Sequence, residues 1–460
     1  MVNADLLGHK LVGSSALAVG ALGLAAAAGL AAGSGRGLAW LPIAFGAAVI
    51  LLVGVGGPGL GVALLPAVSV AVPLSLGTGT QSRIVAGLIF AALLLGTWAL
   101  QGALARDLKL VASPVNAPTL AFGLVWVLAY LYSDVTRSPL IESWATFGMV
   151  QVGQMAVVLV SAGVLLLALN AGRDPRWIQV ATWAFLGLGA LALVAMYLHL
   201  RPVVMALSTL GLFAMWAVAL SWSQALFNEG LPRWLRLGLA SLALGWTYTA
   251  TFGQTIWFSG WMPSLVALLV ITFARSKPLA LLLLVAVGTA CALNADQLYR
   301  VLWVDKVVGG GDLTRLDIWR HTWQIIQMQP LLGTGPAGYA LYNRNLFADS
   351  PFALSTHSNY LDVLAQTGFV GAAIFAWLLA SLLVVGRRAC RQWRSNFAGA
   401  FARGASGGLL GLLVAMALGD WLIPFAYNQT IGGFRYTVHS WVFLGFLASL
   451  AAMRPRPEVR

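Results

Sequence analysis

The sequence SNYLDVLAQTGFVGAAIFAWLLASLLVVG, residues 358–386, holds a single charged residue, Asp362, and is followed at once by Arg387 and Arg388. A run of about 20 apolar residues is long enough to cross the hydrocarbon core of a bilayer as an α-helix. Basic residues gather on the cytoplasmic side of such helices. This stretch therefore predicts a membrane-spanning helix that ends in the cytoplasm.

The rest of the chain has the same character. Of its 460 residues, 60% are hydrophobic and only 9% are charged, whereas a typical soluble domain has about 25% charged residues. This composition excludes a water-soluble globular enzyme, and it excludes intrinsic disorder, which needs low hydrophobicity. We expect an all-α, polytopic integral membrane protein with about 12 to 14 transmembrane helices. The apolar runs lie at 11–32, 37–55, 58–76, 84–104, 118–132, 149–170, 177–198, 202–226, 235–252, 257–274, 278–293, 358–386, 405–424 and 438–453.

The positions of Lys and Arg predict the orientation. Residues 387–403 carry five arginines and no acid, so this loop should be cytoplasmic. Counting helices outward from it places both termini in the cytoplasm, with 17 of the 27 basic residues and five of the 14 acids on that side. The net charge of +13 is then +12 inside and +1 outside. It therefore reflects topology and predicts no nucleic-acid partner.

One long connection, 294–357, interrupts the helices, and the orientation places it outside. It divides the chain into N-terminal transmembrane helices (1–293), the outer loop, and C-terminal transmembrane helices (358–460). A loop of this length in a compact chain is usually functional. Residues 312–329 predict an amphipathic helix in the membrane interface, with Asp312 as its N-cap. Its apolar stripe is Leu316, Trp319, Trp323 and Ile326.

Polar residues of this loop are the first candidates for a site. Arg315 lies at the edge of the stripe, where it either extends toward water or binds a lipid phosphate. Gly333, Gly335 and Gly338 predict a turn whose backbone N–H groups could approach a phosphate, although a plain turn explains them better. His321 is expected on the solvated face.

His357 is the candidate general base. It falls on the first turn of the predicted helix, where the helix dipole disfavours an imidazolium ion and leaves a neutral ring that can accept a proton. Gly368 and Gly371 lie on the same helical face, so we expect a neighbouring helix to pack close beneath the histidine. A lone histidine at a helix start is more often a hydrogen-bonded cap, but the glycine face favours a functional role.

These residues resemble a known family. His357-Ser358, nine residues and Gly368-Phe-Val-Gly371 fit the pattern His-[Asn/Ser/Gln]-x9-Gly-x2-[Gly/Thr/Tyr] of the O-antigen ligases. The upstream segments Arg315-Leu-Asp-Ile-Trp319 and Pro330-Leu-Leu-Gly-Thr-Gly335 are similar to the same ligase and polymerase superfamily.

The resemblance implies an all-helical glycosyltransferase of the C type in the bacterial inner membrane, acting in lipopolysaccharide biosynthesis. Such an enzyme transfers a glycan from undecaprenyl (polyprenyl) diphosphate to an acceptor hydroxyl on the periplasmic side, and in O-antigen ligases the acceptor is lipid A–core. The implied partners are the lipid-linked donor, a glycolipid or glycan acceptor, and membrane lipids. His357 would be the base or would orient the acceptor, and Arg315 would bind the diphosphate.

No cofactor or metal is expected. The sequence has no Asp-x-Asp motif, and arginine can replace a metal in neutralising diphosphate. In-line attack with a histidine base would invert the anomeric centre.

One family feature is missing. The family usually has Ser-Arg-x3-Leu before the long loop, whereas this chain reads Ser259-Gly-Trp-Met-Pro-Ser-Leu265, with Trp261 or a neighbour where the arginine is expected. Arg435 and Arg201 are candidates to replace it, with Arg435 preferred. The residues predicted more weakly to bind substrate are Asp420, Asn359, Tyr360 and Gln366.

Several functions remain open at this stage. A glycan ligase and a repeat-unit polymerase share the same chemistry. A lipid or solute transporter would carry polar residues near the membrane midplane, whereas here they gather in one outer loop, and this distribution favours an enzyme. A lipid-binding scaffold would not need His357.

Overall fold

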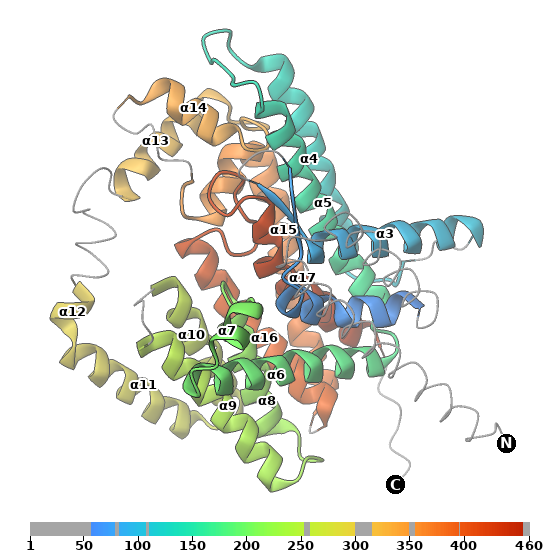
Figure 1. Cartoon of the computed structure of the whole chain (residues 1–460), viewed down its shortest axis with the longest axis vertical. Helices are drawn as coiled ribbons and strands as arrows, with labels where there is room; N and C mark the ends of the chain where they lie inside the picture. The colour runs from blue at the N-terminus through green and yellow to red at the C-terminus, as the bar shows by residue number, and fades with distance from the viewer. Residues whose placement is uncertain are drawn as a thin grey trace.

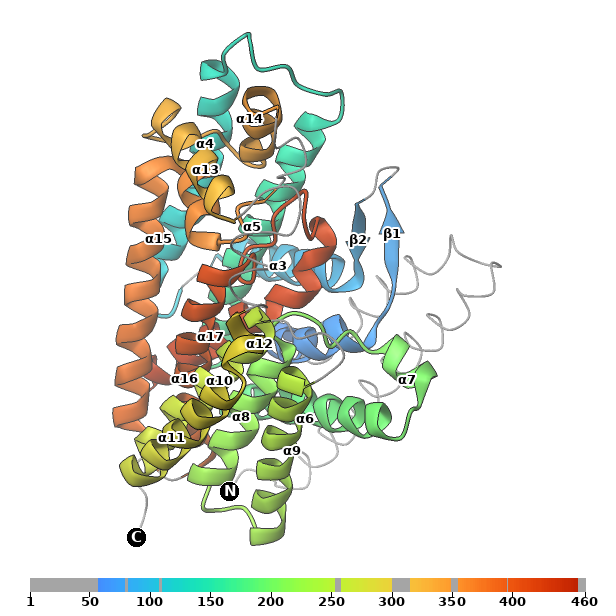
Figure 2. The same ribbon diagram turned by 90° about the vertical axis from the view of Figure 1, so that its left-hand side faces the viewer.

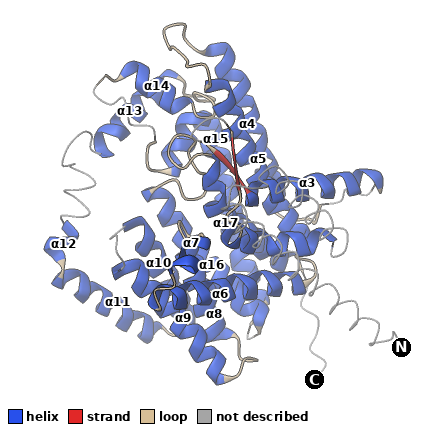
Figure 3. Ribbon diagram, in the orientation of Figure 1, coloured by secondary structure: helices blue, strands red, loops and turns tan. Residues whose placement is uncertain are grey.

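The structure is a computed structural model that describes residues 57–78, 82–106, 110–252, 258–299, 315–348, 355–394 and 396–453. Within these ranges the chain is almost entirely helical (Figures 1 and 3). The described strands are β1 (Ser75–Gly77) and β2 (Arg83–Val85), which pair antiparallel in a small ribbon. The predicted all-α, polytopic membrane fold is confirmed, and the ribbon is the one local departure among the described residues.

Six described helices are long and apolar enough to cross a membrane: α3 (Ala86–Leu104), α4 (Asn116–Thr136), α5 (Phe147–Ala171), α6 (Pro175–Tyr197), α15 (Asn359–Gln392) and α16 (Phe397–Leu418). The shorter apolar helices are Gly57–Ala71, α8 (Phe213–Phe227), α10 (Phe258–Arg275) and α11 (Lys277–Leu293). Two further long helices are α9 (Arg233–Phe252) and α17 (Phe434–Ala452). The small elements are α7 (Arg201–Ala206), α12 (Ala295–Tyr299), α13 (Arg315–Met328), α14 (Gly338–Leu346) and the 3₁₀ turn η2 (Ile431–Gly433).

The helices follow the predicted apolar runs, with two informative differences. The run 202–226 is divided into α7 and α8, and Gly211 between them has the left-handed φ of +69°. The run 405–424 ends as a helix at Leu418, so Asp420 lies in the following loop and not inside a spanning helix. The runs 11–32 and 37–55 lie outside the described residues.

Side-chain caps fix two helix starts. Asp174 accepts the backbone N–H of Arg176 at 3.1 Å, and Pro175 occupies the first position of α6. The Oδ1 atom of Asn396 accepts the N–H of Gly399 at 3.0 Å at the start of α16. Both are the arrangements that satisfy otherwise unpaired N–H groups at a helix N-terminus.

Small residues let α16 approach its neighbours at the centre of the bundle. A Cβ on Gly404 would overlap the side chain of Ser223 in α8, and one on Gly407 would lie 2.6 Å from Ile271 in α10. Close backbone approach of this kind is how helices associate in membranes, where burial of apolar surface from water does not drive them together. The glycine face of α16 therefore fixes the positions of α8 and α10.

Loops predicted to share a side of the membrane also meet in the structure. Glu142, between α4 and α5, exchanges hydrogen bonds with Asn345 of α14, each of 3.0 Å. At the other end, Gln224 of α8 donates to the carbonyl of Phe397 at 3.3 Å, and Arg403 lies over the ring of Phe227. These contacts join neighbouring loops at the two ends of the helical bundle.

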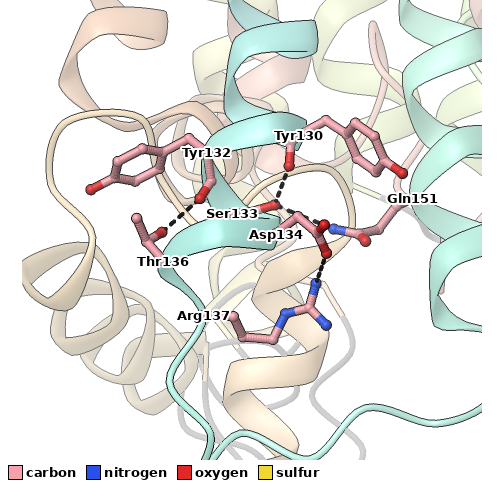
Figure 4. A network of polar contacts seen from close by, with 7 residues as sticks. All are labelled: Tyr130, Tyr132, Ser133, Asp134, Thr136, Arg137 and Gln151. Carbon is pink, nitrogen blue, oxygen red and sulfur yellow. Dashed lines mark hydrogen bonds and ion pairs between the residues drawn. The ribbon is translucent and has the colours of Figure 1, made fainter.

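The helices α13 and α14 lie at the end of the molecule formed by α4, α5 and the start of α15 (Figures 1 and 2). Polar contacts order the end of α4 beneath them: Ser133 Oγ donates to the carbonyl of Tyr130 at 2.9 Å, and Arg137 pairs with Asp134 at 3.5 Å (Figure 4). Gln329, after α13, donates to the carbonyl of Thr136 at 3.4 Å. This bond joins the end of α13 to the end of α4.

Candidate active site at the start of helix α15

His357 lies in a tight turn just before α15. The helix begins at Asn359, with Ser358 as its N-cap, so the prediction that His357 belongs to the first helical turn is wrong by two residues. His357 has a left-handed φ of +53°, and its N–H donates to Ser355 Oγ at 3.1 Å. Such a backbone costs about 1–3 kcal/mol outside glycine and persists where the surroundings enforce it, often at functional sites.

Asp362 and Trp319 hold this turn from two sides. The Oδ1 atom of Asp362 accepts the hydroxyl of Thr356 at 2.7 Å and its backbone N–H at 3.3 Å. Trp319 of α13 donates its indole N–H to the carbonyl of Thr356 at 3.0 Å. Asp362 lies in the first turn of α15, and the non-helical backbone before the helix brings it close to the His357 turn through Thr356.

Asp420 connects the same turn to the loop after α16. Its Oδ2 atom accepts the Ser355 hydroxyl and the Asn428 side-chain amide, both at 2.7 Å. Asp420 is 1% exposed. The carboxylate is therefore a buried anchor shared by the turn that carries His357 and by the loop that precedes α17.

Arg315 supplies positive charge close to this carboxylate. It starts α13, it donates to the carbonyl of Leu418 at a long 3.4 Å, and it interacts electrostatically with Asp420. Burial lowers the pKa of the Arg315 guanidinium, and the negative charge of Asp420 partly offsets this. The Arg315 guanidinium is half-buried, lies near one carboxylate and makes one weak hydrogen bond. Because a guanidinium has five N–H donors, several remain available to bind an anion.

The two substitute arginines proposed from the sequence do not join this cluster. Arg435, at the start of α17, lies over the ring of Tyr436 and donates to its hydroxyl. Its Nε is buried and has no partner among the described residues. Arg201 is exposed at the start of α7, which Figure 2 places away from α13. Within the described part of the chain, Asp420 has no hydrogen bond or ion pair with either of them.

Three of the weaker candidates face other parts of the protein. Asn359 is buried; its Oδ1 accepts the N–H of Leu422 at 2.8 Å, and its amide donates to the carbonyl of Ile423 at 2.8 Å. Tyr360 donates to the carbonyl of Leu413 in α16 at 2.8 Å. Gln366 accepts the N–H of Ala337 at 2.8 Å. These contacts join α15 to the loop after α16 and to the glycine turn, which is a structural role.

The glycine turn is locked against a break in α15. The backbone at Gly368 is non-helical, with φ of 64° and ψ of −168°. Thr334 and Gly335 donate their N–H groups to the carbonyls of residues 365 and 366, at 2.9 and 3.0 Å. Phe369 in turn donates to the carbonyl of Pro330 at 2.8 Å. These turn amides already have protein acceptors, so the structure agrees with the preferred interpretation as a plain turn and not with the weaker one, that the amides approach a phosphate.

The predicted glycine contact also has a different partner. A Cβ on Gly368 would overlap the carbonyls of Pro330 and Leu331, so the segment that packs there is the glycine turn and not a neighbouring helix. A Cβ on Gly371 would overlap the side chain of Thr367 in its own helix. In the structure, the motif spacing between His357 and the two glycines therefore corresponds to the stretch of α15 between the histidine turn and the break in the helix.

The amphipathic helix α13 agrees in part with its prediction. Leu316 and Trp323 are exposed, as an interfacial stripe requires, whereas Ile326 is buried and Trp319 is bonded to the histidine turn. His321 is not simply solvated, because its ring stacks on Phe347 with centroids 3.8 Å apart. The predicted cap Asp312 lies outside the described residues.

Sequence reasoning missed Ser355 and Asn428, which bind Asp420, and underrated Asp362. The bond between Thr356 and Asp362 spans six residues, beyond the three-residue spacing of a capping box, so no standard motif indicated Asp362. No local pattern indicates Asn428, which reaches Asp420 only through the tertiary fold.

The chain matches the family model described as O-antigen ligase over residues 237–376. The match extends from α9 through the first part of α15, and it includes Arg315, His357, Gly368 and Gly371. No curated protein matches the chain. The resemblance inferred from the motifs is thereby confirmed, and it supports a membrane enzyme of the O-antigen ligase and polymerase superfamily.

Proposed function

We propose that this protein transfers a glycan from a polyprenyl diphosphate, such as undecaprenyl diphosphate, to an acceptor hydroxyl, as in ligation of O-antigen to lipid A–core. The observation that carries the proposal is the link from Arg315 through Asp420 and Ser355 to His357. It couples a cation suited to a diphosphate with a histidine suited to accept a proton, on segments far apart in the sequence. The match to the O-antigen ligase family agrees with it.

The proposed reaction is a single displacement at the anomeric carbon. His357 accepts the proton of the acceptor hydroxyl while that oxygen bonds to the sugar carbon. The bond from this carbon to the phosphate oxygen breaks, and its electron pair leaves with the polyprenyl diphosphate. Arg315 stabilises the charge that develops on the leaving group. Attack opposite the leaving group inverts the anomeric configuration, so a retained configuration in the product would contradict this mechanism.

The proposed site faces the periplasm. The inner loops carry most of the basic residues, and the turn with His357 lies near α13, whose exposed Leu316 and Trp323 suit a membrane interface. The polyprenyl chain can then remain in the bilayer while its diphosphate reaches Arg315, and a glycolipid acceptor can approach along the same surface.

Deletion of the gene followed by analysis of surface glycolipids tests the proposal. Lipid A–core without glycan, together with accumulated lipid-linked polymer, is the result expected for a ligase. Core with a single repeat unit would instead identify the polymerase of the same superfamily, and an unchanged profile would exclude both. Complementation with Arg315→Ala and His357→Ala should fail, whereas Arg320→Ala should restore the wild-type profile, because Arg320 is exposed on the same helix and pairs only with Asp317 in the contacts defined for it.

A further inference from the structure

Two buried acids lie together behind the turn that carries His357. Asp362 is 2% exposed and Asp420 is 1% exposed, and they accept hydrogen bonds from the consecutive residues Thr356 and Ser355, which brings the two carboxyl groups close enough to interact electrostatically. Each carboxyl group has one oxygen that accepts hydrogen bonds from the protein, from Thr356 to Asp362 and from Ser355 and Asn428 to Asp420. The other two oxygens, Asp362 Oδ2 and Asp420 Oδ1, have no donor among the described residues.

Two ionised carboxylates in this position would be strongly unfavourable. Like charges in contact inside a protein repel each other, and the ionised form of each also loses its hydration. Buried acceptors without donors add a further cost. A single proton placed between the two free oxygens removes all three problems, because a protonated carboxyl group donates one hydrogen bond.

We propose that Asp362 and Asp420 share one proton, and that this acid pair positions both Arg315 and His357 for glycan transfer. Asp362 is then the protonated member and donates to Asp420 Oδ1. Asp420 keeps the negative charge, since its other oxygen accepts two hydrogen bonds and Arg315 is nearby. The role in transfer rests on the proposed function, but the shared proton does not.

The pair connects the two proposed catalytic groups through short bonds. Asp362 holds Thr356, Asp420 holds Ser355, and Ser355 accepts the N–H of His357. Loss of the proton would place two negative charges beside one arginine. That would push the two acids apart, disturb both hydroxyl contacts and leave Arg315 less able to attract a diphosphate.

Other ionisable groups around the pair do not replace the proton. Arg315 of α13 supplies the positive charge, and Tyr339 of α14 faces Asp362. Burial is the main cause that raises the pKa of Tyr339, with a smaller contribution from Asp362, so this tyrosine stays neutral. His357 is next to these residues in the turn. Among the described groups facing the pair, one positive charge therefore balances one negative charge.

Isosteric variants separate the two acids. Asparagine in place of Asp362 keeps an acceptor for Thr356 and supplies an N–H donor to Asp420, so Asp362→Asn should recover most of the kcat/KM that Asp362→Leu loses. Asp420→Asn removes the carboxylate that holds Arg315 in position, and the misplaced guanidinium should raise the KM for the lipid diphosphate donor about tenfold or more, although the local charge becomes more positive. The wild type should lose activity at alkaline pH as the pair loses its proton, and Asp362→Asn should not show this loss. Equal effects of Asp362→Asn and Asp420→Asn, or the same alkaline loss in Asp362→Asn, would overturn the proposal.

Infrared difference spectroscopy tests the proton without any transferase assay. The purified full-length protein is titrated from neutral to alkaline pH in wild-type and Asp362→Asn forms. The wild type should lose the carbonyl stretch of one protonated carboxylic acid over this range, and the variant should not. A wild type without such a band would overturn the shared proton. A band that behaves as expected in a protein without glycan transfer would leave the acid pair established and would refute only the proposed function.

Discussion

Gly333 and Gly368 lie in two segments that pack directly against each other, and neither position has room for a side chain. A Cβ on Gly333 would overlap the backbone of Gln366 and Thr367, and a Cβ on Gly368 would overlap the carbonyl of Leu331. Both residues have left-handed φ values, of 69° and 64°. This reciprocal contact joins the glycine turn to the break in α15, and so fixes the turn after α13 relative to the helix that follows His357.

The glycine contact predicts a large loss of stability for Gly368→Ala. The substitution adds both backbone strain and steric overlap, and we expect the free energy of unfolding to fall by about 3 kcal/mol. Thermal unfolding of the purified protein in detergent measures it. Gly187→Ala is the matched control, because Gly187 lies within α6 with open space around it. Its stability should stay the same or rise slightly; equal melting of Gly368→Ala and wild type would exclude the contact as a constraint.

Arg315 should act on donor binding through the geometry of its guanidinium. Arg315→Ala should lower kcat/KM for the polyprenyl-diphosphate donor about a hundredfold, the effect of losing one strong charge-stabilising donor in an active site. Arg315→Lys should recover only a small part, since an ammonium group cannot bind a phosphate through a planar pair of N–H donors. Kinetics with purified protein and varied donor concentration measure this effect. Full activity of Arg315→Lys would show that charge alone is needed.

His357 should affect the rate and leave donor affinity largely intact. His357→Ala should lower kcat by about a hundredfold or more, as expected for loss of a general base, with little change in donor binding. Steady-state kinetics with varied donor concentration measure both parameters. A mutant with unchanged kcat and reduced donor affinity would instead identify His357 as a binding residue.

The proposed topology can be tested with single cysteines in a background that lacks Cys291 and Cys390. Leu140 is 86% exposed in the loop between α4 and α5, so Leu140→Cys should react with a membrane-impermeant maleimide on cells whose outer membrane is permeable. Arg387→Cys, in the exposed basic segment near the end of α15, should react only after the inner membrane is opened. The opposite result at both positions would reverse the orientation.

The sequence was sufficient for the helices, because lipid requires backbone groups to be bonded within each spanning segment and apolar length is then a strong indicator. It was less informative where the chain stops being helical. Nothing in the apolar run 405–424 shows that α16 ends at Leu418, which frees Asp420 to meet Ser355. The left-handed backbone of His357 is likewise enforced by tertiary contacts, so a helical periodicity placed this residue two positions too far into α15.

Sequence motifs were sufficient to select Arg315 and His357 as candidates and to predict the family match, because short spacing patterns preserve local geometry. They were not sufficient for the acid pair, because Asp362 and Asp420 belong to different helices or loops and meet only through the packing of α15 against α16. The arginine that the family has near Trp261 is missing from this chain, and neither candidate replaces it beside Asp420. Arg201 is at the start of α7, and Arg435 packs on Tyr436.

The position of Asp420 in the chain also determines when the site can form during synthesis. Arg315 and His357 leave the ribosome before Asp420, and α16 separates it from the helix that follows His357. Until α16 has been inserted, the hydroxyl of Ser355 has no carboxylate to bind and Arg315 has no partner charge. If these residues act as proposed, a nascent chain whose histidine and arginine have already reached the membrane is still inactive, and activity begins only near the end of translation.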